Sequence, residues 1–115
     1  MNWSTKKIIL TGGSSGIGAH LVSVLKEKGA AVVFAGLEKE LVDIISNKHD
    51  AKGFVADLSK ENELTHFFEE AVQYLGGLDV LINNAGFVIA KPFEELKRSD
   101  FEAMFAINTI APARL

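Results

Sequence analysis

The sequence predicts an α/β fold in which helices cover both faces of a doubly wound parallel sheet. Three observations support this prediction. Short apolar runs alternate with segments of helical period along the whole chain, apolar residues make up 48% of the 115 positions, and ten glycines add to them. Such alternation is typical of parallel sheets with right-handed crossovers, and a high apolar content favours strands buried on both faces. A chain of this length usually forms one compact domain.

The first half of the chain is predicted to form strand, helix, strand, helix and strand in turn. These elements are residues 8–10, 17–28, 31–35, 38–47 and 54–56. One face of the first helix, at a period of 3.6 residues, is apolar and comprises Ile17, Leu21, Val24 and Leu25. Gly29 suits the end of this helix.

The second half is predicted to add a helix, a strand and a last helix. Ser59 is expected to cap the first of these helices, in which apolar residues from Leu64 to Leu75 form a stripe. Residues 80–82 form the fourth strand, and the last helix begins at Ser99 with a capping box to Glu102. No stop signal follows before the chain ends, so we expect the chain to be a piece of a longer domain.

Composition excludes several classes of function. The formal charge of −3 gives no general attraction to nucleic acid. Without cysteine, disulfides, thiolate metal sites and cysteine nucleophiles are excluded. The three histidines are scattered and predict no metal site. No apolar run approaches the length of a membrane helix, and the run at residues 8–10 is too short for a signal peptide. We expect a cytoplasmic location and no membrane partner.

A glycine-rich turn follows the first strand and opens the first helix. Gly12, Gly16 and Gly18 have the spacing Gly-x-x-x-Gly-x-Gly, and Ser14 and Ser15 add hydroxyl groups. A helix N-terminus approached by bare backbone suits a pyrophosphate. The turn lacks the Gly-Lys-Ser/Thr ending of a P-loop. The alternative is a glycine-rich turn that binds no ligand.

Four motifs together resemble the short-chain dehydrogenase/reductase family. They are Thr11-Gly12-x-x-x-Gly16-Ile17-Gly18, Asp57-Leu58, Asn83-Asn84-Ala85-Gly86 and Asn108. Their order and spacing cover almost the whole chain. The resemblance implies a Rossmann-like sheet, of which the chain holds the first four β-α units. Residues 1–115 would then be the N-terminal part of one dinucleotide-binding domain.

The resemblance implies that the chain binds NAD(P). It assigns cofactor binding to Gly12, Ser14, Ser15, Gly16, Ile17, Gly18, Leu37, Asp57, Leu58, Asn84, Ala85 and Gly86. The family places Asp57 beside the adenine and Asn84-Ala85-Gly86 near the nicotinamide ribose. Taken alone, Asp57 could instead cap the entry to a helix, and the asparagines could form a plain turn.

Asn108 is the one catalytic residue that the resemblance implies. It lies at helical spacing from Phe101, Met104 and Phe105, so its amide needs a hydrogen-bond partner. In the family this asparagine supports a proton relay, partly through its backbone carbonyl. Pro112 has no N–H with which to occupy that carbonyl, and we hypothesise that it reinforces the relay. The alternatives are a satisfied core amide and an ordinary proline kink.

The choice between NAD and NADP rests on the end of the second strand. Gly36 stands where an NAD-type Asp would lie, and Leu37 where an NADP-type Arg often lies. Glu38 could reach the ribose, and Lys39 could reach a phosphate. The missing Asp removes repulsion, so the sequence favours NADP.

The resemblance also implies an activity. It is hydride transfer between the nicotinamide and a small-molecule carbonyl or alcohol substrate, in a homo-oligomer. The family's catalytic Ser, Tyr and Lys would lie beyond Leu115, because Tyr74, the only tyrosine, precedes the Asn motif and has Leu78 four residues on. We therefore expect the 115-residue chain alone to be inactive. The alternative is a short, non-catalytic dinucleotide-binding or interaction module.

Overall fold

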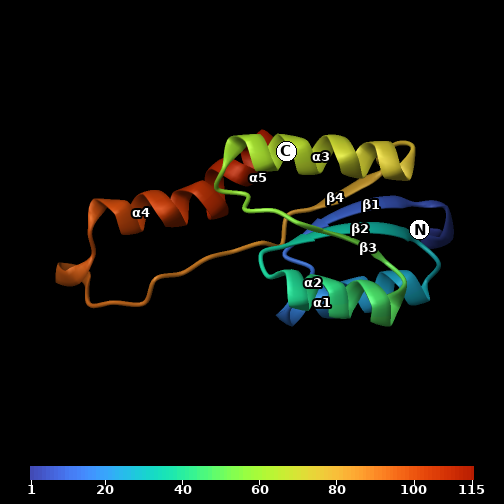
Figure 1. The fold of residues 1–115 in the computed structure, drawn as a ribbon, viewed down its shortest axis with the longest axis horizontal. Coiled ribbons are helices and arrows are strands. Elements are labelled where there is room, and N and C mark those ends of the chain that lie inside the picture. Colours follow the sequence, from blue (N-terminus) through green and yellow to red (C-terminus); the bar gives the residue numbers. More distant parts are fainter.

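The computed structural model describes residues 1–115 and contains one parallel sheet with helices on both faces (Figure 1). The strands are β1 (Lys7–Thr11), β2 (Ala31–Gly36), β3 (Lys52–Val55) and β4 (Val80–Ile82). Their spatial order is β3-β2-β1-β4, and every pairing is parallel. The chain therefore reverses its direction of travel across the sheet between β1 and β4, where open α/β sheets bind ligands. The predicted fold class is confirmed.

Side-chain alternation along the strands separates two cores. Helices α1 (Gly16–Glu27) and α2 (Lys39–His49) cover one face of the sheet, while α3 (Glu61–Leu75) and the short α5 (Ala111–Arg114) cover the other (Figure 1). Successive residues of a strand point to opposite faces. Ile8 and Leu10 accordingly belong to the core under α1 and α2, and Ile9 belongs to the core under α3.

Two predicted helix caps are wrong. Helix α3 begins at Glu61 after Lys60, and the Ser59 hydroxyl donates instead to Asp57 Oδ1 at 2.6 Å. The Asp57 carboxylate, two residues earlier, is a nearer acceptor for the Ser59 hydroxyl. The Ser59 side chain therefore does not bond to the amides at the start of α3.

The last long helix, α4 (Arg98–Phe105), begins one residue before the predicted Ser99. Because of that shift, Asp100 Oδ2 accepts the Lys97 amide at 3.0 Å. Glu102, the expected partner of Ser99, pairs with Arg98 at 2.9 Å instead.

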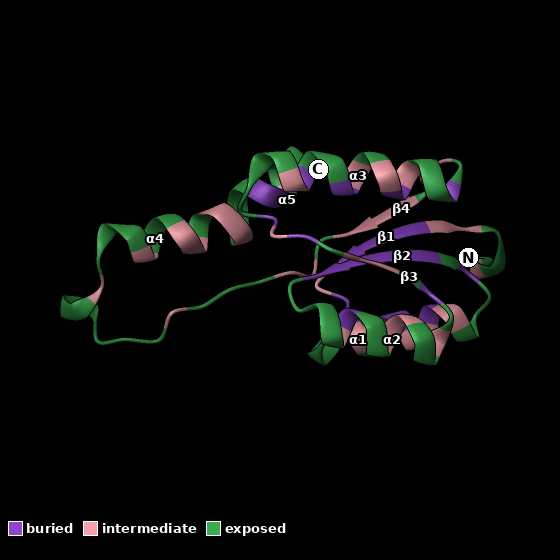
Figure 2. Cartoon of the chain, in the orientation of Figure 1, coloured by how far each residue is buried: buried purple, intermediate pink, exposed green.

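The region after β4 leaves the body of the molecule. An extended segment with one short turn, η2 (Phe93–Glu95), leads away from the sheet and returns through α4 (Figure 1). The chain then makes a π-helical turn, η3 (Ala106–Ile110), before α5. No residue of α4 is buried (Figure 2), and Phe105 is 56% exposed.

None of the helices combines the length and the apolar character needed to cross a bilayer.

Candidate functional site

The glycine turn is shaped by positive backbone angles and by close approach. Gly12 and Gly16 have φ values of 71° and 56°, which disfavour other residues. A Cβ on Gly12 would lie 2.9 Å from Ala85 Cα, and one on Gly18 would lie 2.7 Å from the Gly12 carbonyl carbon. Close packing therefore requires glycine at positions 12 and 18, and the left-handed backbone favours it at position 16. The turn brings bare backbone to the edge of the sheet.

The N-terminus of α1 has free donors. Ser15 is its N-cap but makes no side-chain cap hydrogen bond. The amides of Gly16, Ile17 and Gly18 donate no hydrogen bond within the chain. These donors sit at the positive end of a 12-residue helix dipole. Such an arrangement suits an anionic group.

Thr11 fixes the loop after β4 against this turn. Its side chain, in a residue only 2% exposed, accepts the Asn84 amide at 3.1 Å and the Ala85 amide at 3.0 Å through Oγ1. Asn84 Nδ2 in turn donates to the Gly12 carbonyl at 3.1 Å. Thr11 is the first residue of the glycine motif, but the sequence alone predicted no structural role for it. Its position at the end of an apolar strand, where a buried hydroxyl needs partners, was the available signal.

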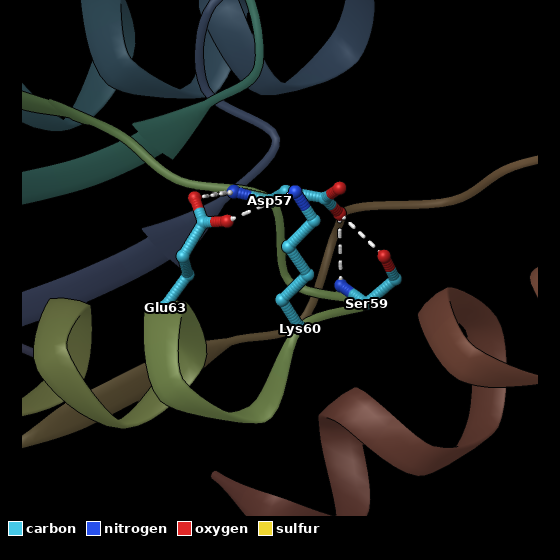
Figure 3. Close-up of polar contacts among 4 residues, drawn as sticks. All are labelled: Asp57, Ser59, Lys60 and Glu63. Atoms are coloured by element: carbon cyan, nitrogen blue, oxygen red, sulfur yellow. Dashed lines mark hydrogen bonds and ion pairs between the residues drawn. The ribbon is translucent and has the colours of Figure 1, made fainter.

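Asp57 lies after β3 and holds a small polar network (Figure 3). Its Oδ1 accepts both the amide and the hydroxyl of Ser59, at 3.0 and 2.6 Å, and its own amide donates to Glu63 Oε1 at 3.0 Å. The Ser59 hydroxyl is the main cause that holds the pKa of Asp57 below its ordinary value. Desolvation opposes this effect, while the Ser59 amide and the Lys60 charge add to it. The carboxylate is therefore ionised at neutral pH.

A cleft of about 640 Å³ joins these parts at the point where the strand order reverses. Its size is within the range of small-molecule sites. Of the predicted cofactor residues, it is lined by Gly12, Ser14, Ser15, Ile17, Leu37, Asp57, Leu58, Asn84, Ala85 and Gly86. Gly16 and Gly18 shape the turn beneath but do not line the cleft.

The cleft also contains residues that sequence reasoning did not assign. They are Ala35, Gly36, Glu38, Leu41, Ala56, Ser59, Phe87, Ala103 and Ile107. Glu38 was weighed as a ribose contact, but Phe87, Ala103 and Ile107 come from the last third of the chain and gave no signal. Ile17 was predicted on the apolar face of its helix, yet it is 75% exposed at the cleft. Helix α1 buries Leu25, as predicted, together with Gly18 and Val22, which were not assigned to that face.

Asn108 lies outside the lining of the cleft and holds the loop beside it. Its Oδ1 accepts the Phe87 amide and its Nδ2 donates to the Phe87 carbonyl, both at 2.8 Å. The side-chain amide is thus satisfied by backbone. The predicted α-helical stripe from Phe101 to Asn108 is wrong, because the chain changes to the π-helical turn η3 at Ala106, where the Ala111 amide donates to the Ala106 carbonyl.

Comparison with known proteins identifies the class of protein that has this fold and site. The family model described as "short chain dehydrogenase" matches residues 6–115. The chain therefore belongs to the short-chain dehydrogenase family.

Relatives by sequence cover most of the chain. Glucose 1-dehydrogenase of Gluconobacter oxydans is 34% identical over 111 residues, which are 90% of this chain and 41% of that protein. Hydroxynaphthalene reductase-like protein Arp2 of Metarhizium majus is 36% identical over 112 residues, with 92% and 42% covered. The chain thus spans about two fifths of the length of these relatives.

Solved structures with the same fold also match nearly the whole chain. A blue fluorescent protein from a metagenomic library, in complex with NADPH, superposes with a TM-score of 0.92 at 32% identity, over 99% of this chain and 49% of that one. The 3-ketoacyl-(acyl-carrier-protein) reductase from Brucella melitensis, complexed with NADH, gives 0.90 at 25% identity, over 97% and 48%. The chain corresponds to about half of each.

Proposed function

We propose that this chain is the dinucleotide-binding part of an NAD(P)-dependent oxidoreductase that transfers hydride between a nicotinamide and a carbonyl or alcohol substrate. The observation that carries the proposal is the cleft at the strand-order reversal, which joins the free amides of α1 to the Asp57 and Asn84 loops. The family match supports the reaction class. The solved relatives that hold NADPH or NADH support the cofactor class.

The residues present fit such a cofactor. A Cβ on Gly12 would meet the backbone of Ala85, and one on Gly18 would meet the Gly12 carbonyl, so glycine lets the turn pack closely against the loop after β4. The amides at the start of α1 make no hydrogen bond within the chain. In this proposal the free amide of Ile17 and the hydroxyls of Ser14 and Ser15, all three of which line the cleft, hold the pyrophosphate. When the cofactor is bound, its nicotinamide ring would supply or accept the hydride.

The two ends of the cleft would hold the two bases. Asp57 Oδ2 makes no hydrogen bond within the chain, so an adenine amine can donate to it, and Leu58 would frame that pocket. The backbone of Ala85 and Gly86, fixed through Thr11, would lie along the nicotinamide ribose.

Asn108 would then act as a positioning residue through Phe87. Its side chain is fully used by the Phe87 backbone, so any part in a proton relay would fall to its carbonyl. Pro112, four residues on, has no N–H to donate there. A backbone amide bonded to the Asn108 carbonyl in the complete protein would contradict the relay.

NADP remains the cofactor that we propose to be preferred. The end of β2 carries no carboxylate at position 36 to repel a 2′-phosphate. Two features limit the preference: Glu38 lines the cleft, and Lys39 Nζ is paired with Asp43 Oδ2 at 2.6 Å. Binding of NADH at least tenfold tighter than NADPH would overturn it.

Assembly and location complete the proposal. The family resemblance supports a homo-oligomer, and α4 offers apolar side chains at Phe101 and Phe105, 37% and 56% exposed. The cytoplasmic location stays a prediction from the sequence.

Binding is the test that this chain permits. NADPH and NADH are titrated into the intact chain and followed by nucleotide fluorescence. We expect saturable binding of both, and about tenfold weaker binding in Asp57→Asn, because an amide donor replaces the acceptor that faces the adenine amine. Asp50→Asn, at the C-terminus of α2, is the matched control and should bind like wild type. A folded wild-type chain that binds neither nucleotide would refute the proposed function.

A further inference from the structure

The backbone amide of Asp57 lies at the open edge of the sheet. Strand β3 is the last strand on its side, so only its inner edge is paired, with β2. Ala56 continues that pairing by donating to the Gly36 carbonyl at 3.0 Å. Successive amides of an extended chain point to opposite edges, so the Asp57 amide points away from β2, where the sheet has no further strand. It therefore needs an acceptor from another element.

Glu63, in the first turn of α3, supplies that acceptor (Figure 3). Its Oε1 accepts the Asp57 amide at 3.0 Å, and its Oε2 lies 3.6 Å from Lys60 Nζ. Asp57 and Glu63 are both acidic, and the positive charge of Lys60 reduces the repulsion between them. The hydrogen bond is partly buried, so it is stronger than it would be in open water.

The other polar groups of Asp57 are also occupied, with one exception. Its carbonyl accepts the Lys60 amide at 3.1 Å, and its Oδ1 accepts both donors of Ser59. The next residue, Leu58, is 7% exposed and belongs to the core under α3. Only Oδ2 is left without a hydrogen bond, and Asp57 lines the cleft. Its backbone and side chain are thus both fixed before a ligand binds, which reduces the ordering cost of binding.

We infer that Glu63 is a positioning residue of the nucleotide site, which holds the Asp57 backbone at the edge of β3 and so keeps Oδ2 in place for a donor in the cleft. The inference rests on the proposed function and adds to it a residue that does not line the cleft. The role requires an acceptor at position 63 rather than a charge. Glutamine there would keep the acceptor, whereas alanine would remove it.

The first test separates the acceptor from the charge. 5′-AMP and NADH are titrated into the intact chain and followed by calorimetry. Glu63→Ala should weaken both about fivefold, because Asp57 must then be ordered on binding, and Glu63→Gln should stay within about twofold of wild type. The matched control, Glu69→Ala, removes the same charge from an exposed position of α3 and should bind like wild type. Equal losses in the two Glu63 variants, or no loss in Glu63→Ala, would overturn the inference.

The second test asks whether Glu63 acts through Asp57. Asp57→Ala removes the oxygen that Glu63 is inferred to position, and it should weaken NADH about tenfold. Adding Glu63→Ala to Asp57→Ala should then weaken NADH less than about twofold further, because both changes remove the same contact with the ligand. Losses that multiply in the double variant would show that Glu63 does not act through Asp57.

Hydrogen exchange of the ligand-free chain tests the contact itself. The Asp57 amide should exchange about tenfold faster in Glu63→Ala than in wild type, and an unchanged rate would show that Glu63 does not hold this amide. A folded wild-type chain that binds neither 5′-AMP nor NADH would refute the proposed function. Saturable binding without these contrasts would refute only the inference about Glu63.

Discussion

The body of the molecule up to β4 and the region that follows it are packed in different ways. In the body, each face of the sheet has its own continuous core, and Phe34 and Phe67 are almost completely buried. After β4, Ala111 is the only buried residue. Ala85, Ile107 and Leu115 pack against the core under α3 but are only partly buried. The rest of that region is held by polar contacts, such as Asn108 to Phe87 and Lys91 to Asp100.

This difference in packing runs through the cleft and divides it into two halves. The half of the cleft proposed to bind adenosine and pyrophosphate is built on residues fixed by the core. The half near Phe87, Ala103 and Ile107 is built on a segment that is only partly buried and is positioned by the packing of Ile107 and by the hydrogen bonds between Asn108 and Phe87. The proposed nucleotide-binding side therefore rests mainly on residues held by the two cores. The side that would face a substrate depends on weaker local contacts.

The largest expected effect contrasts one phenylalanine from each region. Phe67 is 1% exposed in the α3 core, so Phe67→Ala should lower the free energy of unfolding by about 3–5 kcal/mol. Phe105 is 56% exposed on α4, and Phe105→Ala should cost less than about 1 kcal/mol. Urea unfolding followed by far-UV circular dichroism measures both. Comparable losses would show that α4 is as firmly packed as the body.

A smaller and local effect is expected at Asn108. Asn108→Ala removes both hydrogen bonds to the Phe87 backbone, at a cost of about 1–2 kcal/mol for opening this segment. The urea midpoint should change little, because the segment opens without unfolding the body. Hydrogen exchange at the Phe87 amide should be about tenfold faster or more. The control is Asn62→Ala on the exposed surface of α3, which should leave the exchange rate of the Phe87 amide unchanged. An unchanged exchange rate in Asn108→Ala would show that the contact does not hold the segment.

The same contrast explains what could be predicted from the sequence. The order of strands and helices followed from periodicity, and the fourth strand, Val80–Ile82, has the predicted bounds. The motif residues on the ends of β1, β3 and β4 meet in one cleft because carboxyl ends of parallel strands share one edge of the sheet. These features depend on local pattern and on sheet geometry, which a sequence contains.

The wrong predictions concern residues whose local sequence pattern favoured one structure while contacts with other parts of the chain imposed another. Ser59 has the chemistry of a cap but found a closer acceptor in Asp57. Ile17 has the period of a core residue, but it lies in the first turn of α1 at the open cleft and is exposed. The change to a π-helical turn at Ala106–Ile110 has no counterpart in apolar periodicity, so the face shared by Phe105 and Asn108 was mispredicted. The hydrogen bond from the Asp57 amide to Glu63 joins the end of β3 to α3 and could not be seen in either element alone.

The smallest expected effect concerns the charge of Asp57. Ser59→Ala removes the hydroxyl hydrogen bond that is the main cause of the lowered pKa, so the pKa of Asp57 should rise toward its ordinary value, as measured by NMR titration of the side-chain carboxyl. Asp100 is the internal control, since its pKa is lowered chiefly by the Lys97 amide and should not change. An Asp57 pKa unaffected by Ser59→Ala would contradict the network in Figure 3.

The sign of the accompanying stability change follows from linkage. A carboxyl whose pKa is lower in the folded than in the unfolded chain stabilises the fold above its unfolded pKa of about 4, and that contribution is lost as the pH falls through the lower, folded value. The stability difference between wild type and Ser59→Ala should therefore be largest at neutral pH and should narrow in acid below about pH 4. Urea midpoints at pH 7 and pH 3 measure it. Because Asp57 lies in the cleft rather than in either core, the effect should be small, and a difference that grows in acid would show that Ser59 stabilises the protonated carboxyl instead.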